Sequence, residues 1–225
     1  MRSILLHGGP GLKNYWSQVF SDDQLQGFEH FEFPLADNID DYVFELKNRV
    51  QGSDCALIGH SFGGTIALEA ISRAQLPEAK KLVLVSSPVS SLAQQAHENE
   101  MKRLGLDPEN PLQVFLSKLE MVDPQCTEQL MSILQTIDVK CLELMGASYL
   151  SKFDLSRTVA ELNIPCLILF GSEDHRLPVE TQRNLGHLNS GLQFEVIEGA
   201  GHFPFLTNDH KNRFLQLVRE FSAEN

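Results

Sequence analysis

Short apolar runs alternate along most of the chain with segments whose apolar residues recur every three or four positions. The runs lie at residues 3–6, 28–33, 55–58, 81–86, 166–170 and 192–197. Most are apolar at consecutive positions, which is typical of strands buried on both faces, whereas residues 28–33 alternate apolar and polar positions. The intervening segments, such as 38–50 and 207–221, have helical spacing. This alternation predicts an α/β fold with a mostly parallel sheet of about six strands flanked by helices.

Residues 90–163 interrupt the alternation. This stretch has no β-branched strand run, and apolar positions such as Leu130, Ile133, Leu134 and Ile137 recur at helical spacing. Prolines and a glycine divide it into short segments. We therefore predict an all-helical insertion at 90–163, placed between two parts of one core, 1–89 and 164–225.

The strongest single motif lies between the predicted strand 55–58 and a predicted helix that includes residues 65–70. Gly59-His60-Ser61-Phe62-Gly63 fits the G-x-S-x-G nucleophile elbow, in which a strand turns directly into a helix. Such a turn strains the central residue, and glycines beside it avoid clashes of a Cβ with the neighbouring strand or helix. Ser61 is therefore expected to project above the sheet with a free hydroxyl, at the positive end of the helix.

Three further loops that follow predicted strands carry chemistry. In parallel sheets, functional residues gather in loops beyond the carboxyl ends of the strands. The first strand is followed by HGGPG at 7–11, the strand 166–170 by GSEDH at 171–175, and the last strand by GAGHF at 199–203. A serine, an acid and an imidazole thus occur in the order Ser61, Asp174, His202, which is the order of α/β-hydrolases.

These segments, HGGPG, GHSFGG, GSEDHRLP and GAGHFPF, resemble those of the α/β-hydrolase fold superfamily, and the resemblance extends over nearly the whole chain. It implies that Ser61 is the nucleophile, His202 the general base and acid, and Asp174 the group that orients His202. It also implies an oxyanion hole formed by the backbone N–H groups of Phe62 and Gly9. The helical insertion matches the position of the family's cap.

Several rival assignments remain. His175 directly follows the acid and is an alternative base, while Glu173 is an alternative orienting acid. His7 and His60 flank the site and are expected to be structural hydrogen-bonding groups, and Glu198 a solvated residue at a strand end. The methionines of the insertion and Phe115 are expected to be ordinary helix packing, with one or two facing the site.

Composition limits the partners. The 225 residues suit one domain, or one core with an inserted cap. A net charge of −12 argues against nucleic acid and anionic membranes, although a local basic pocket could still bind a small anion. No apolar run approaches 18 residues, and the N-terminal sequence lacks a signal-peptide core, so we expect a cytoplasmic protein without a membrane span. The four cysteines favour buried thiols; no metal or other cofactor is expected.

One departure from the family is visible. Its members usually have two antiparallel strands before the oxyanion strand, and the sequence leaves no room for them before residue 3. The segment 28–33 would then lie at or near a sheet edge, which leaves a monomer and a homodimer both open.

The motifs leave the reaction open. HGGPG is similar to proline iminopeptidases, whereas GHSFGG is nearer to capped carboxylesterases, including pimeloyl-ester hydrolases. A serine at position 61 excludes the related dehalogenases and epoxide hydrolases that use an aspartate there. The sequence therefore predicts a serine hydrolase acting on a small or medium carboxylic ester or thioester. A same-fold carbon–carbon bond hydrolase or lyase and a non-catalytic ligand-binding homologue are the alternatives.

Overall fold

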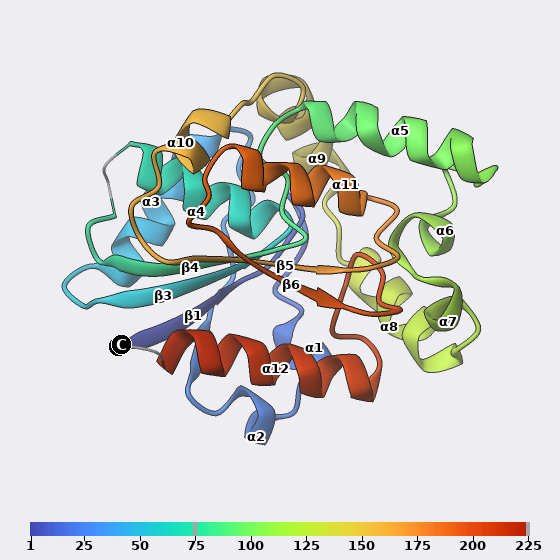
Figure 1. Cartoon of the computed structure of the whole chain (residues 1–225), viewed down its shortest axis with the longest axis horizontal. Helices are drawn as coiled ribbons and strands as arrows, with labels where there is room; N and C mark the ends of the chain where they lie inside the picture. Colours follow the sequence, from blue (N-terminus) through green and yellow to red (C-terminus); the bar gives the residue numbers. More distant parts are fainter. Residues whose placement is uncertain (74–75, 224–225) are drawn as a thin grey trace.

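A parallel sheet of six strands runs through the centre of the computed structural model, which describes residues 1–73 and 76–223 (Figure 1). The strand order is β2-β1-β3-β4-β5-β6, and every neighbouring pair is parallel. The strands are β1 (Arg2–Leu6), β2 (Phe28–His30), β3 (Cys55–His60), β4 (Ala79–Val85), β5 (Cys166–Gly171) and β6 (Gln193–Ile197). The predicted α/β class and the parallel sheet of about six strands are therefore confirmed.

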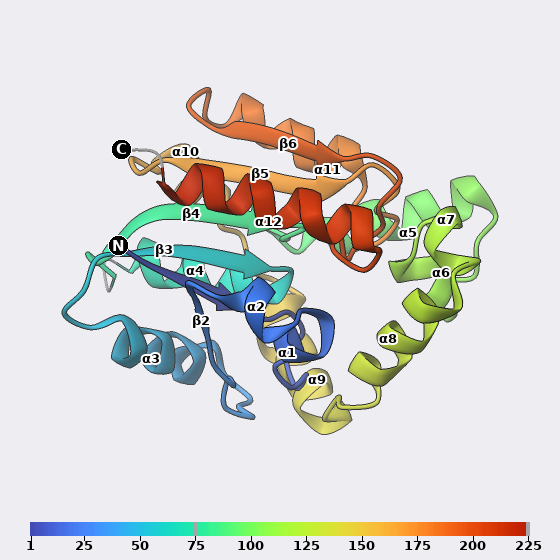
Figure 2. The same ribbon diagram turned by 90° about the horizontal axis from the view of Figure 1, so that it is seen from below.

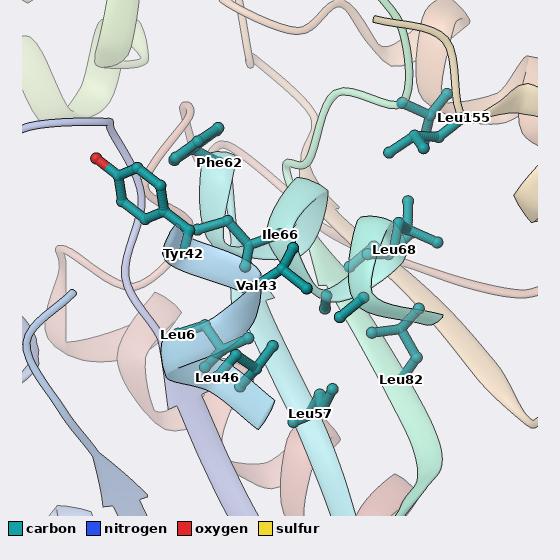
Figure 3. Packing of buried hydrophobic residues seen from close by; sticks show 14 of the residues in the cluster. Leu6, Tyr42, Val43, Leu46, Leu57, Phe62, Ile66, Leu68, Leu82 and Leu155 are labelled. Carbon is teal, nitrogen blue, oxygen red and sulfur yellow. The ribbon is translucent and has the colours of Figure 1, made fainter. Parts of the chain in front are cut away.

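Helices cover both faces of this sheet, which is why β3 and β5 are buried at every residue. One face carries α3 (Ile39–Val50), α4 (Phe62–Ser72), α10 (Ser156–Ala160) and α11 (Val179–Arg183). The other carries α1 (Trp16–Val19), α2 (Asp22–Leu25) and α12 (Asn208–Ala223) (Figure 2). Figure 3 shows the first of the two cores, where Leu46 and Ile66 from helices meet Leu57 and Leu82 from strands.

The edge strand is shorter than its sequence pattern indicated. Residues 28–33 were expected to form one strand, but β2 ends at His30, and it pairs with β1 at only three positions. The N–H of Phe33 donates to His7 Nε2 at 3.2 Å instead of extending the ladder, and Phe33 itself is buried. The alternating pattern therefore reflects a half-buried edge segment, which lies at the edge as predicted.

Residues 90–163 contain helices and one isolated bridge between Ser90 and Asp154. The helices are α5 (Leu92–Leu104), α6 (Pro111–Phe115), α7 (Lys118–Met121), α8 (Pro124–Leu134), α9 (Val139–Met145), the π-helical turn η1 (Gly146–Leu150) and α10. Figure 2 shows α5 to α8 beyond the carboxyl ends of the strands. The later part of the segment is not separate from the sheet, because Met145, Phe153 and Val159 belong to the same buried cluster as Leu57.

Local sequence signals set several helix starts. Ser21 with Gln24, and Ser117 with Glu120, form capping boxes before α2 and α7. After β5 the helix α11 is followed directly by a 3₁₀ turn, η2 (Asn184–His187), which contains a glycine.

Two global expectations can be compared directly with the structure. All four cysteines are buried and unpaired, as the sequence indicated. Within residues 1–73 and 76–223, no helix has both the length and the apolar character needed to cross a membrane.

The central strand gives a test of this packing. Leu57→Ala, at a fully buried position of β3, is expected to lower the free energy of unfolding by about 2–5 kcal/mol, because it leaves a cavity between two helical layers. Leu35→Ala makes the same change at a residue that is 62% exposed and is the control. Urea unfolding measures both, and equal destabilisation by the two variants would contradict this description of the core.

Candidate active site

Ser61 occupies a strained turn between β3 and α4. Its backbone has φ 50° and ψ −119°, one of two positive φ values among described residues other than glycine. The Ser61 N–H donates to Val85 O at 2.8 Å, so the neighbouring strand β4 fixes the turn. The hydroxyl is partly exposed at the carboxyl edge of the sheet, as the elbow motif predicted.

The glycines around Ser61 are required by close backbone approach. A Cβ on Gly59 would lie 2.4 Å from the Cα of Gly64, and one on Gly63 would lie 2.5 Å from the carbonyl oxygen of Leu6. A Cβ on Gly64 would lie 2.2 Å from Ser87 Oγ. The turn is therefore packed on β1, on the loop after β4 and on its own helix, and the clash expected from the motif is confirmed.

Three distant loops bring a carboxylate, an imidazole and the Ser61 hydroxyl together. His202 Nε2 lies 3.1 Å from Ser61 Oγ. His202 Nδ1 lies 3.0 and 3.1 Å from the two carboxylate oxygens of Asp174. Asp174 is buried, and its Oδ1 also accepts the N–H of Leu177 at 2.8 Å. The three residues therefore form a continuous hydrogen-bonded chain.

The rival groups lie differently. Glu173 Oε2 accepts the backbone N–H of Lys118 at 3.0 Å, so this carboxylate is directed to the insertion and not to His202. The backbone carbonyl of His175 accepts a hydrogen bond from His97 Nδ1 at 2.9 Å, which ties the loop of residues 171–175, the acid loop, to α5. Among the described contacts, neither His175 nor Glu173 is hydrogen-bonded to Ser61 or His202.

The loop 7–11 lies beside the elbow. A Cβ on Gly8 would be 2.9 Å from Ser61 Cβ, and Gly9 has φ 70°, a conformation that favours glycine. Phe62 is the first residue of α4, so its N–H has no acceptor within the helix. Two backbone donors predicted for an oxyanion hole, Gly9 and Phe62, thus belong to segments that adjoin Ser61.

A buried relay connects this loop to the His202 loop. The N–H of Gly8 donates to the Tyr15 hydroxyl at 2.7 Å, and that hydroxyl is hydrogen-bonded to His60 Nδ1. His60 Nε2 lies 2.9 Å from the carbonyl oxygen of His202. Burial and the nearby His202 lower the pKa of His60 well below its ordinary value, so the ring is neutral. A neutral ring satisfies both bonds when Tyr15 donates to Nδ1 and Nε2–H donates to His202.

The two histidines that the sequence indicated as structural, His7 and His60, both make buried hydrogen bonds. His7 accepts the N–H of Phe33 at Nε2, and His60 is bonded on both ring nitrogens. Both arrangements agree with the expected structural role. Tyr15 was missed as part of the site, because a single aromatic residue in a helix start carries no motif.

The helical insertion holds the His202 loop from the other side. Phe115 O accepts the N–H of His202 at 2.9 Å, and the Phe115 ring lies 5.6 Å from the imidazole, centroid to centroid. The N–H of Gly201 donates to Glu120 Oε2 at 2.9 Å, and Glu120 Oε1 lies 3.2 Å from His210 Nδ1. A Cβ on Gly201 would lie 2.6 Å from Phe115 O. Phe115 is therefore one insertion residue that contacts the site.

The side chains near Ser61 offer no obvious metal site. In the part of the chain that the structure describes, no group of three or more His, Cys, Asp or Glu side chains is arranged to hold a metal ion.

The neutral state of His60 makes stability depend on pH. Because the folded-state pKa is depressed, the contribution is fully present above the ordinary histidine pKa of 6.5 and is lost as the pH falls below it. We expect the unfolding free energy to fall between about pH 7.5 and pH 5.5, by up to about 1.4 kcal/mol per pH unit below 6.5 from this residue. His60→Gln should flatten that dependence, as measured by denaturant unfolding at each pH.

The matched control is His187→Gln, which changes a histidine at an exposed position. His7 and His97, whose pKa values are also lowered by burial, add to the same slope in wild type and variants alike. An unchanged slope in His60→Gln would contradict the neutral relay.

The sequence of this chain is similar to a known protein family and to several named proteins. Residues 4–214 match the Alpha/beta hydrolase family. The biotin biosynthesis bifunctional protein BioHC of Teredinibacter turnerae is 24% identical, over 98% of this chain and 44% of its own length. The pimeloyl-[acyl-carrier protein] methyl ester esterase of Photobacterium profundum is 22% identical, over 88% of this chain and 81% of its own. This chain thus spans less than half of the length of the first relative.

A solved structure shows the same fold. An esterase from Exiguobacterium antarcticum superposes with a TM-score of 0.74 and 18% identity, over 99% of this chain and 91% of that one.

Proposed function

Since this chain belongs to the alpha/beta hydrolase family, as its motifs indicated, we propose that it is a serine hydrolase that cleaves a small or medium carboxylic ester or thioester. The observation that carries the proposal is the hydrogen-bonded chain from Ser61 through His202 to Asp174. Relatives and a solved neighbour named as esterases support the ester as substrate.

Ser61 is the proposed nucleophile. A serine hydroxyl is a weak nucleophile until a base removes its proton, and His202 Nε2 is within hydrogen-bond distance of it. As Ser61 Oγ bonds to the ester carbonyl carbon, its proton passes to His202. That proton then goes to the leaving alkoxide or thiolate, and an acyl-enzyme remains. Water, which gives a proton to His202, next attacks the acyl carbon. The bond from that carbon to Ser61 Oγ then breaks, His202 returns the proton to Oγ, and the carboxylic acid leaves.

Asp174 is the proposed orienting group. Its carboxylate holds Nδ1–H of His202, which leaves Nε2 free to accept the proton of Ser61, and its negative charge stabilises the imidazolium. The N–H groups of Gly9 and Phe62 are the proposed donors to the oxyanion that forms on the ester oxygen. Each such donor contributes on the order of 10²–10³ in rate.

Residues 90–163 are proposed as the cap over the core formed by 1–89 and 164–225. Its contact with the site through Phe115 supports a role in covering the acyl or alcohol group. The segment contains eleven Asp and Glu against six Lys and Arg, so it disfavours an acidic macromolecule as the carrier of the substrate. We therefore expect the substrate to be a small ester free in solution. We expect the protein to be a cytoplasmic monomer or homodimer.

The proposal predicts a sharp loss in single variants. Ser61→Ala and His202→Gln should each reduce kcat/KM for p-nitrophenyl esters by at least about 10³-fold, because each removes one member of a coupled unit. Asp174→Asn should also reduce it strongly, since the imidazole loses its orienting charge. Initial rates on a series of acetate to octanoate esters measure this, and a fluorophosphonate should label wild type but not Ser61→Ala.

Ser190→Ala changes an exposed serine and should retain the activity. Circular dichroism checks that each variant is folded. Labelling of Ser61 without turnover of any ester in the series would favour carbon–carbon bond chemistry, and a folded protein without labelling would favour a non-catalytic binding protein.

A further inference from the structure

A cavity of about 590 Å³ lies where the acid loop meets the helical insertion. Arg176, two residues after Asp174, lines it together with the first turn of α5 and η1. Ser90, Ser91 and Ser151 contribute hydroxyls, and Phe153 contributes an aromatic side chain. A cavity of this size fits a small organic ligand.

Arg176 makes no ion pair or hydrogen bond in the part of the chain that the structure describes, although the Asp174 carboxylate acts on it through space. Arg73 pairs with Asp40 and Glu69, and Arg103 pairs with Glu100, whereas Arg176 makes neither an ion pair nor a hydrogen bond to a described residue. Its side chain is nevertheless only partly exposed. A guanidinium is always charged and offers five N–H donors, so a partly desolvated one whose donors make no hydrogen bond is costly until an anion occupies the space beside it.

Two serine hydroxyls at the start of α5 are further donors, whereas the backbone N–H groups of Ala93 and Gln94 already donate to Ser90 and Ser91 carbonyls. This helix has 13 residues, no acid in its first turn, and an N-cap residue, Ser91, whose side chain does not cap it. The hydroxyls of Ser90 and Ser91 make no hydrogen bond to a described residue, and both line the cavity. The positive end of the α5 dipole and Arg176 therefore act on the same space.

One acidic side chain that lines the cavity, Glu98, disfavours the binding of an anion there. Glu98 lines the cavity about a turn and a half into α5, and its Oε1 accepts a hydrogen bond from Gln94 Nε2 at 3.1 Å. Glu98 forms no ion pair with Arg176, so the two charges stay apart in one cavity. The Asp174 carboxylate, bound to His202, also acts on Arg176 from the acid loop.

We propose that this cavity binds a small organic anion, whose carboxylate or phosphate is held by Arg176, the hydroxyls of Ser90 and Ser91 and the start of α5. The side chains of Phe153 and Leu92, which line the cavity, contact the carbon chain of the ligand. The anion is either the charged end of the ester substrate or a second, free metabolite with the same group.

Isothermal titration with two probes, inorganic phosphate and adipate, tests the proposal at constant ionic strength. Wild type should bind at least one probe saturably with one site per chain. Arg176→Gln should weaken that binding at least about tenfold, the effect of losing a charge-assisted hydrogen bond. Arg176→Lys should fall between the two, because it keeps the charge but not the fork of donors. Glu98→Gln should tighten binding.

Arg183→Gln is the matched control, since it removes the same charge from an exposed position on α11. Absence of saturable binding of both probes, or equal binding by wild type and Arg176→Gln, overturns the proposal. If Arg176→Gln does not fold, the opposite signs expected for Glu98→Gln and Arg176→Lys still decide it.

A second measurement identifies the source of the anion. The ratio of kcat/KM for mono-p-nitrophenyl adipate and p-nitrophenyl hexanoate should fall in Arg176→Gln if the cavity holds the charged end of the substrate. An unchanged ratio, with probe binding lost, assigns the cavity to a free anion. Failure of all ester turnover would contradict the proposed hydrolysis but would leave the titration as an independent test.

Discussion

The position of His202 is the constraint on which the rest of the site depends. Its two ring nitrogens face Ser61 and Asp174, while its backbone carbonyl is bonded to His60 and its backbone N–H to Phe115. The loop that carries it follows a strand at the edge of the sheet, where few neighbours hold it. Contacts from the elbow, the acid loop and the insertion therefore hold the His202 loop in place, as a helix or strand would otherwise do.

Much of this arrangement could be predicted from sequence because each part is local. The elbow needs glycines at positions where the backbone of β1 or α4 approaches, and those glycines are visible as a motif. The loops that carry Asp174 and His202 follow apolar runs, and parallel strands bring their carboxyl ends to one edge. The positions of these motifs after the strands were therefore enough to predict that Ser61, Asp174 and His202 lie close together.

What could not be predicted depends on side chains that meet across long distances in sequence. Tyr15 joins Gly8 to His60, and Glu120 reaches Gly201 from the insertion, yet neither residue belongs to a recognisable pattern. The end of β2 at His30 has the same origin, since the His7 side chain takes a backbone donor that the alternation had assigned to a strand. Periodicity records which residues are buried and not which donor each one meets.

The insertion and the core also share more than the sequence boundary indicated. Residues such as Met145 and Val159 complete the hydrophobic layer over the sheet, and Cys126 and Leu130 join the opposite cluster near Phe205. Through Phe115 and Glu120 the same insertion holds the His202 loop. A substitution that loosens α6 or α7 would therefore move the imidazole as well as the proposed cap.

The charges around His202 fit its proposed role, in which the ring becomes cationic for part of each turnover. His60 lies 5.2 Å from its ring, centroid to centroid, and burial keeps the pKa of His60 low, so this neighbour adds no positive charge. The pKa of His97 is lowered by burial as well. The charge nearest to the imidazole is then the Asp174 carboxylate, whose Oδ2 lies 3.0 Å from His202 Nδ1. If His60 were protonated, two cations in a buried site would oppose each other, and proton transfer from Ser61 would become harder. The neutral relay thus serves the proposed chemistry as well as the position of the loop.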